Sequence, residues 1–144
     1  MLNLGKVVPQ DYFILLTPHK MPQTHPTEAE IAAAHATLYA AGLEVRTAVA
    51  GPEHVSRSLS THSSSFSRPM QELATEAGWG WVWTRPGLER KMRSMLNIAM
   101  LCALNRMTEL GVHVRGAVRN GVTEEEIREV LLQVAIYVGM PAGL

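Results

Sequence analysis

Apolar residues recur at helical spacing along most of the second half of the sequence, and this pattern constrains the fold more than any other feature. Between Glu89 and Leu104 the apolar side chains follow the three-four spacing that places them on one helix face. The opposite side of this segment is also apolar, which predicts a helix in the middle of the structure. Because no segment shows the alternation typical of a half-buried strand, the sequence predicts an all-α fold.

Capping residues and helix breakers divide the chain into about six helices. Thr27 with Glu30, and Thr123 with Glu126, match the capping box that begins a helix. We expect a first helix from Thr27 to the break at Gly51–Pro52 and a short second helix that begins at Pro52. A serine-rich loop follows over 61–67. Further helices are expected over about 69–83, 89–104, 108–119 and 123–138. Asn120–Gly121 is expected to end the fifth helix as a left-handed cap.

Residues 1–26 differ from the rest because they contain Pro9, Pro18, Pro22 and Pro26 and show no helical period. We expect an N-terminal arm or tail here and a single folded domain over 27–144. The arm is either loosely ordered or docked on a neighbouring subunit through its apolar run at 12–16. That run and the all-round apolar fourth helix predict a homo-oligomer, a trimer or larger.

Composition and charge exclude several classes of protein. Thirteen basic and 13 acidic residues give a net charge of zero, which argues against nucleic-acid binding. No apolar run approaches the roughly 20 residues of a membrane helix, and the run at 12–16 has no basic leader or cleavage site. Cys102 is the only cysteine, so we expect an inert buried thiol and no internal disulfide in a cytoplasmic protein. The histidines show no ligand spacing, so no metal site is predicted.

Three segments of the sequence resemble one known family. The first joins 42–46 to 51–55, the second is 79–88, and the third runs from 93 through 106 and continues to Ala142. Over roughly a hundred residues, their order, spacing and identity are similar to carboxymuconolactone decarboxylases, a far stronger signal than a short motif. The resemblance implies a fold of the alkylhydroperoxidase D type, assembly as a trimer or hexamer, and cofactor-free decarboxylation of a lactone acid in aromatic catabolism.

The sequence departs from the family pattern in three places. Family members usually carry a glutamate where this chain has Trp81, their chain continues past Pro141–Ala142 with another amphipathic helix, and their N-terminal arm is shorter. An indole does not titrate as a carboxylate does, so we expect little activity on carboxymuconolactone itself. On a helix, Trp79 and Trp83 share a face and are expected to pack inside, while Trp81 points away from them.

Loss of CO₂ from a small carboxylated ring requires a cation for the carboxylates, a donor where negative charge develops, an acid that protonates carbon, and a mostly apolar pocket. His113 is the candidate for the proton transfer because it lies on the apolar side of its helix with Leu110 and Val114. Its position also fits a hydrogen-bonded core histidine, and the resemblance favours the catalytic role. Glu109, one turn earlier, is either a partner that orients the imidazole and raises its basicity or a surface residue.

Four further residues are candidates for substrate binding: Arg85, Arg93, His54 and Trp81. Arg85 can grip a carboxylate with two parallel hydrogen bonds, or it can bridge helix ends through backbone carbonyls. Arg93 is a weaker candidate for the same role, and His54 matches a family histidine. We expect a pocket beside His113 that is lined by aromatic or aliphatic side chains, with Arg85 within reach.

These observations leave more than one function open. The leading interpretation is a cofactor-free, decarboxylase-like lyase that acts on a small carboxylated lactone or ring compound. An alternative is an enzyme of secondary metabolism with the same fold and a changed reaction, such as isomerisation, cyclisation or decarboxylation of a bulkier substrate. A third is a paralogue that assembles but does not catalyse. A peroxidase is disfavoured because it needs a cysteine pair, which the sequence lacks.

Overall fold

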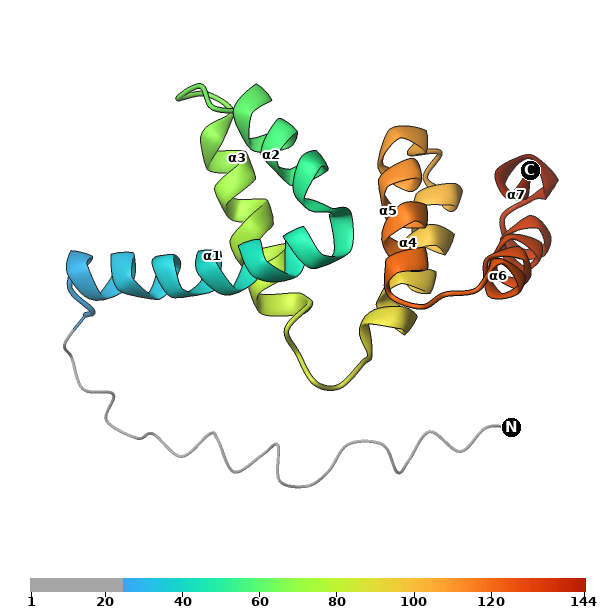
Figure 1. The fold of residues 1–144 in the computed structure, drawn as a ribbon, viewed down its shortest axis with the longest axis horizontal. Coiled ribbons are helices and arrows are strands. Elements are labelled where there is room, and N and C mark those ends of the chain that lie inside the picture. Colours follow the sequence, from blue (N-terminus) through green and yellow to red (C-terminus); the bar gives the residue numbers. More distant parts are fainter. Residues whose placement is uncertain (1–24) are drawn as a thin grey trace.

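The computed structural model describes residues 25–144, and within that range every regular element is a helix (Figure 1). The elements are α1 (Glu28–Ala50), α2 (Pro52–Thr61), α3 (Arg68–Leu73), the π-helix η2 (Ala74–Val82), α4 (Arg90–Ala103), α5 (Met107–Arg119), α6 (Glu124–Tyr137) and α7 (Met140–Gly143). The predicted all-α fold is confirmed. The expected arm over 1–26 lies outside the described residues except for its last two positions.

The helices form two groups that are joined by the loop after η2 (Figure 1). In the first group α1 packs along η2 and contacts α2, and in the second group α4 packs on both α5 and α6. The second half of α1 also meets α5, so this contact joins the two groups. Among the described helices, none has both the length and the hydropathy of a membrane span.

Both predicted capping boxes are present. The Thr27 side chain accepts a hydrogen bond from the Glu30 backbone N–H at 3.2 Å, and the Glu30 carboxylate accepts one from the Thr27 N–H at 2.8 Å. Thr123 and Glu126 repeat the same pair of bonds at the start of α6. These bonds satisfy backbone donors that the first helical turn leaves unpaired, which explains why α1 and α6 begin where they do.

Helices α5 and α4 are each followed by a residue of positive φ whose neighbours close the helix end. Gly121 has φ +81° after α5, and the Val122 N–H donates to the Ala117 carbonyl at 2.9 Å, as the Asn120–Gly121 pair predicted. Asn105 ends α4 in the same way, with φ +53°, although the sequence analysis did not assign it this role. Asparagine is among the few non-glycine residues that adopt this conformation readily.

The predicted helix over 69–83 is present, but its second half is a π-helix rather than an α-helix. The Trp83 N–H donates to the Gly78 carbonyl at 3.1 Å, which is the five-residue spacing of a π-helix. Sequence periodicity did not indicate this change of pitch. π-Helical turns occur frequently at functional sites, and η2 carries one wall of the site described below.

The contact between α1 and η2 is a backbone-to-backbone contact at two glycines. A Cβ atom on Gly42 would overlap the Thr75 carbonyl oxygen, and a Cβ atom on Gly80 would overlap the Leu38 carbonyl oxygen. Both glycines are buried. The close approach of the two helices therefore depends on the absence of a side chain at both positions.

The apolar core falls into two clusters. One lies between α4, α5 and α6 and has at its centre Ile98, Cys102, Ala117, Val122 and Val134. The other consists of Val45 and Val49 on α1 together with Trp83, with Trp79 packed against it. Cys102 is buried in the first cluster, and burial raises the pKa of its thiol, as expected for an unreactive side chain.

Gly42→Ala is expected to lower the free energy of unfolding by about 1–3 kcal/mol, because overpacking at a closed contact outweighs the roughly 1 kcal/mol that alanine contributes in a helix. Urea denaturation followed by circular dichroism measures this change. Gly78→Ala is the matched control, since no atom lies within 4 Å of a Cβ built at Gly78. Equal free energies of unfolding for the two variants would show that the α1–η2 contact has room for a side chain at Gly42.

Candidate active site

A cavity of about 300 Å³ opens beside His113, where the sequence analysis expected one. It lies where α5 faces the first group of helices, and its wall combines polar and apolar side chains from five elements. The lining residues are Arg46, Ala50, His54, Ser58, Gln71, Trp79, Thr108, Glu109, Val112 and His113. The wall is thus more polar than expected, because α1, α2 and α3 contribute Arg46, Ser58 and Gln71.

His113 is held by two tryptophans and an amide. Its ring stacks on Trp79 with centroids 5.9 Å apart and planes 3° from parallel, and it also lies 6.4 Å from the Trp83 ring. The Asn97 side-chain nitrogen lies 3.3 Å from His113 Nδ1. Because an amide N–H₂ group only donates, Nδ1 accepts in this arrangement and Nε2 carries the proton of the neutral ring.

The surroundings of the two cavity histidines favour their neutral forms. Burial lowers the pKa of His113, nearby His54 lowers it further, and the negative charge of Glu109 acts in the opposite direction. Burial also lowers the pKa of His54, together with the positive charges of four arginines on α1, α2 and α5. The cavity therefore has a positive potential even though both of its imidazoles resist protonation.

Arg46 contributes a buried cation to this cavity. Only 7% of its surface is exposed, and its guanidinium donates to Thr75 Oγ1 at 2.9 Å, Ser58 Oγ at 3.0 Å and Gln71 Oε1 at 2.8 Å. All three partners are neutral, and within residues 25–144 no carboxylate lies within ion-pair distance of Arg46. Since buried charges in proteins are normally paired, this guanidinium provides a place for an anion.

The structure brings three of the six sequence-predicted site residues to one cavity, namely His113, Glu109 and His54. Glu109 lies close enough to influence the charge of His113, but the hydrogen bond to the ring comes from Asn97 instead. The other three candidates lie elsewhere in the chain and are described next.

Trp81, Arg85 and Arg93 do not line the cavity. Trp81 is 57% exposed, and the Arg85 guanidinium lies over its ring at 5.1 Å. Arg93 donates to the carbonyl oxygens of Leu88 and Arg85 at 3.1 and 2.9 Å, so it fixes the loop before α4. Within one chain Arg85 does not line the His113 cavity, because Trp79 and Trp83 lie against the His113 ring while the Arg85 guanidinium lies over the exposed Trp81 ring.

Arg46 and Asn97 were not identified from the sequence as site residues. A usable signal existed for Arg46, which lies among Gly42, Val45 and Val49 on the buried face of α1. A charged residue on an apolar helix face is unusual and calls for a partner. Asn97 offers no comparable signal, because its role depends on how α4 is rotated against α5.

Comparison with known proteins relates the chain to decarboxylases. A sequence model described as the carboxymuconolactone decarboxylase family matches residues 68–144. The chain is 48% identical over 108 residues to nitrosuccinic acid decarboxylase npaB of Metarhizium robertsii, and the match covers 75% of each protein. It is 46% identical over 105 residues to 4-carboxymuconolactone decarboxylase of Acinetobacter baylyi, covering 73% of this chain and 78% of that protein.

The His113 ring is expected to titrate below the ordinary histidine pKa of about 6.5, because its surroundings disfavour the charged form. Its folded-state pKa lies below the unfolded value, so its contribution to stability is present above about pH 6.5 and is lost as the pH falls through this region. Nuclear magnetic resonance titration of the ring measures the pKa. Glu109→Gln removes the one neighbouring charge that raises this pKa and should lower it further, and a higher value in this variant would contradict the arrangement.

Proposed function

Because the chain belongs to the carboxymuconolactone decarboxylase family, we propose that it removes CO₂ from a small carboxylated substrate in the His113 cavity, without a cofactor. Two relatives whose names specify decarboxylation support a lyase-type enzyme. Those names give two different substrates, nitrosuccinic acid and carboxymuconolactone. Both are acids with an electron-accepting group, a nitro group in one and a conjugated lactone in the other. The proposed substrate class is therefore a carboxylic acid with such a group.

One observation carries this proposal: a buried guanidinium, which has no acidic partner among residues 25–144, shares a cavity with a histidine. When the bond between carbon and the carboxylate breaks, CO₂ leaves and the electron pair spreads onto an oxygen of the accepting group. The Arg46 guanidinium stabilises the charge on that oxygen. Protonated His113 then donates its proton to carbon, and solvent restores the proton.

The same geometry explains how a histidine with a lowered pKa becomes an acid. In the free protein, burial and neighbouring positive charge keep the His113 ring neutral. An anionic substrate brings negative charge into the cavity and reverses part of this effect, so the ring takes up a proton at Nδ1 when the substrate binds, and the Asn97 amide turns its oxygen toward that N–H. Trp79, which also lines the cavity, supplies apolar surface near the carboxylate that is lost, which disfavours its localised charge.

The changed-reaction alternative rested on Trp81, which stands where the resemblance implies a glutamate. Trp81 lies outside the His113 cavity and is 57% exposed, so within one chain it does not alter the chemistry of that cavity. In this proposal carboxymuconolactone and a substrate of secondary metabolism with the same functional groups therefore fit the site equally well.

We also propose that the protein is a homo-oligomer, a trimer or hexamer. A groove between α4 and α6 is lined mainly by apolar side chains, including Met92, Met95, Leu96 and Val130. Ile136 and Tyr137 near the end of α6 are more than 75% exposed. Apolar surface of this extent on a small domain is typical of a subunit interface.

His113→Gln is expected to lower kcat by about 10²–10⁴-fold, the usual cost of removing a positioned acid. The assay measures CO₂ release from nitrosuccinic acid and from carboxymuconolactone. His62→Gln is the matched control, because this imidazole is exposed at the end of α2. Full activity of the His113 variant would remove His113 from the mechanism, and a wild-type protein inactive on both acids would favour the non-catalytic alternative.

Light scattering of the full chain at micromolar concentration is expected to give the mass of a trimer or a larger oligomer. Leu96→Glu places a charge in the α4–α6 groove and should reduce this mass, since a buried unpaired charge is costly. Glu125→Gln, an exposed change on α6, serves as the control. A monomeric wild type would refute the assembly.

A further inference from the structure

A second cavity, of about 390 Å³, adjoins the His113 cavity. The two share Ala50 and His54 in their walls, so His54 stands between them. The remaining wall of the second cavity contains Arg57 from α2 and both Arg115 and Arg119 from α5. We refer to this second cavity, with its three arginines, as the arginine basin.

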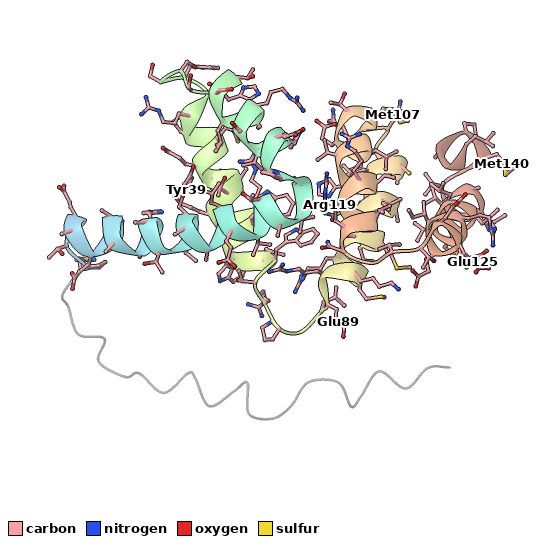
Figure 2. All side chains as sticks on the ribbon, in the orientation of Figure 1. Tyr39, Glu89, Met107, Arg119, Glu125 and Met140 are labelled. Carbon is pink, nitrogen blue, oxygen red and sulfur yellow. The ribbon has the colours of Figure 1, made fainter. Side chains whose placement is uncertain are left out.

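The backbone around the basin leaves room for its guanidinium groups. Arg119 reaches from α5 to the turn between α1 and α2 (Figure 2), where it donates to the Val49 carbonyl at 3.2 Å. A Cβ atom on Gly51, whose φ is +92°, would lie only 2.9 Å from Arg119 Nη2. The absence of a side chain at Gly51 therefore allows both the turn between α1 and α2 and the close approach of this guanidinium.

The basin has an excess of positive charge that no described residue neutralises. Glu53 is the one acid in the wall, and within residues 25–144 no carboxylate forms an ion pair with Arg57, Arg115 or Arg119. Surface arginines usually spread apart or pair with acids, because gathered like charges repel. Three of them around one hollow produce a local field that attracts anions.

The position of the basin limits which anion fits. It lies beside a cavity that, in the proposed function, already holds the reacting end of a carboxylic acid. An anion in the basin is separated from that end only by the wall that contains His54. One small molecule with two acidic ends can occupy both cavities at once, and a guanidinium binds a carboxylate with two parallel hydrogen bonds.

We propose that the arginine basin binds the second, non-reacting carboxylate of a dicarboxylate substrate. This inference rests on the proposed function. It assigns different roles to two sets of cations. The basin holds the carboxylate that stays, whereas Arg46 faces the charge that develops when the other carboxylate is lost. Both acids in the relatives' names carry two carboxylates, and the basin supplies the residues that would bind the one that stays.

Binding of unreactive acids to the full-length protein tests the basin without any turnover. Succinate and propionate differ by one carboxylate and lack an electron-accepting group, so isothermal titration calorimetry reports recognition alone. We expect wild type to bind succinate at least about 10-fold more tightly than propionate, since a charge-assisted contact contributes a comparable free energy. Equal affinities, or inorganic phosphate binding as tightly as succinate, would overturn the proposal.

Arg115→Gln and Arg57→Gln are each expected to weaken succinate binding about 10-fold and to leave propionate binding unchanged. Arg128→Gln is the control, because Arg128 pairs with Glu125 on the outside of α6. Circular dichroism melting curves check that each variant folds. If both basin variants bind succinate as tightly as wild type, the basin proposal is refuted even if the enzyme decarboxylates. If the variants lose succinate affinity alone but the protein shows no activity, the proposed function is refuted and the basin proposal stands.

Discussion

The contact of α1 with η2 at Gly42 and Gly80 is the constraint on which the site depends. Thr75 takes part twice, since its carbonyl lies against Gly42 and its hydroxyl accepts from Arg46, one turn further along α1. The packing of the two backbones therefore also fixes the buried guanidinium. A second close approach, of Gly116 to Val49, brings α5 against the same helix and places His113 opposite Arg46.

The electrostatic character of the site follows from this packing. Arg46 lies among hydroxyl and amide groups, and three further arginines surround the turn after α1. Burial lowers the pKa of both cavity imidazoles, and the arginines lower the pKa of His54 further. The site thus combines fixed guanidinium cations with histidines whose neutral form is favoured.

Much of the fold could be predicted from local sequence signals, because caps and breakers act within a few residues. Thr27, Thr123 and Gly121 determine helix ends through their own backbone bonds, and these ends are where the sequence indicated. The π-helix could not be predicted in this way. The segment lies against α1 at Gly42 and Gly80, where the contacting residues are more than thirty positions apart, and a local pattern does not report such contacts.

Only part of the site could be predicted from the sequence, because it too depends on contacts between distant residues. His113, Glu109 and His54 share a wall because α1 packs on both α5 and α2, and all three were indicated by the family pattern or by helix spacing. Arg85 and Trp81 belong to the same tryptophan segment but contact each other outside the cavity. Which side a residue occupies depends on helix pitch and on the path of the following loop, and periodicity alone does not specify either.

The π-helix has a consequence for how this segment tolerates changes in length. Each turn of η2 contains more residues than an α-helical turn, so deletion of one residue from 74–82 would let the segment relax to the more favourable pitch. That relaxation would rotate Trp83 away from Trp79 and from the His113 ring. A change of length within η2 is therefore expected to displace these rings, whereas the surface loop over 62–67 is expected to tolerate such a change better.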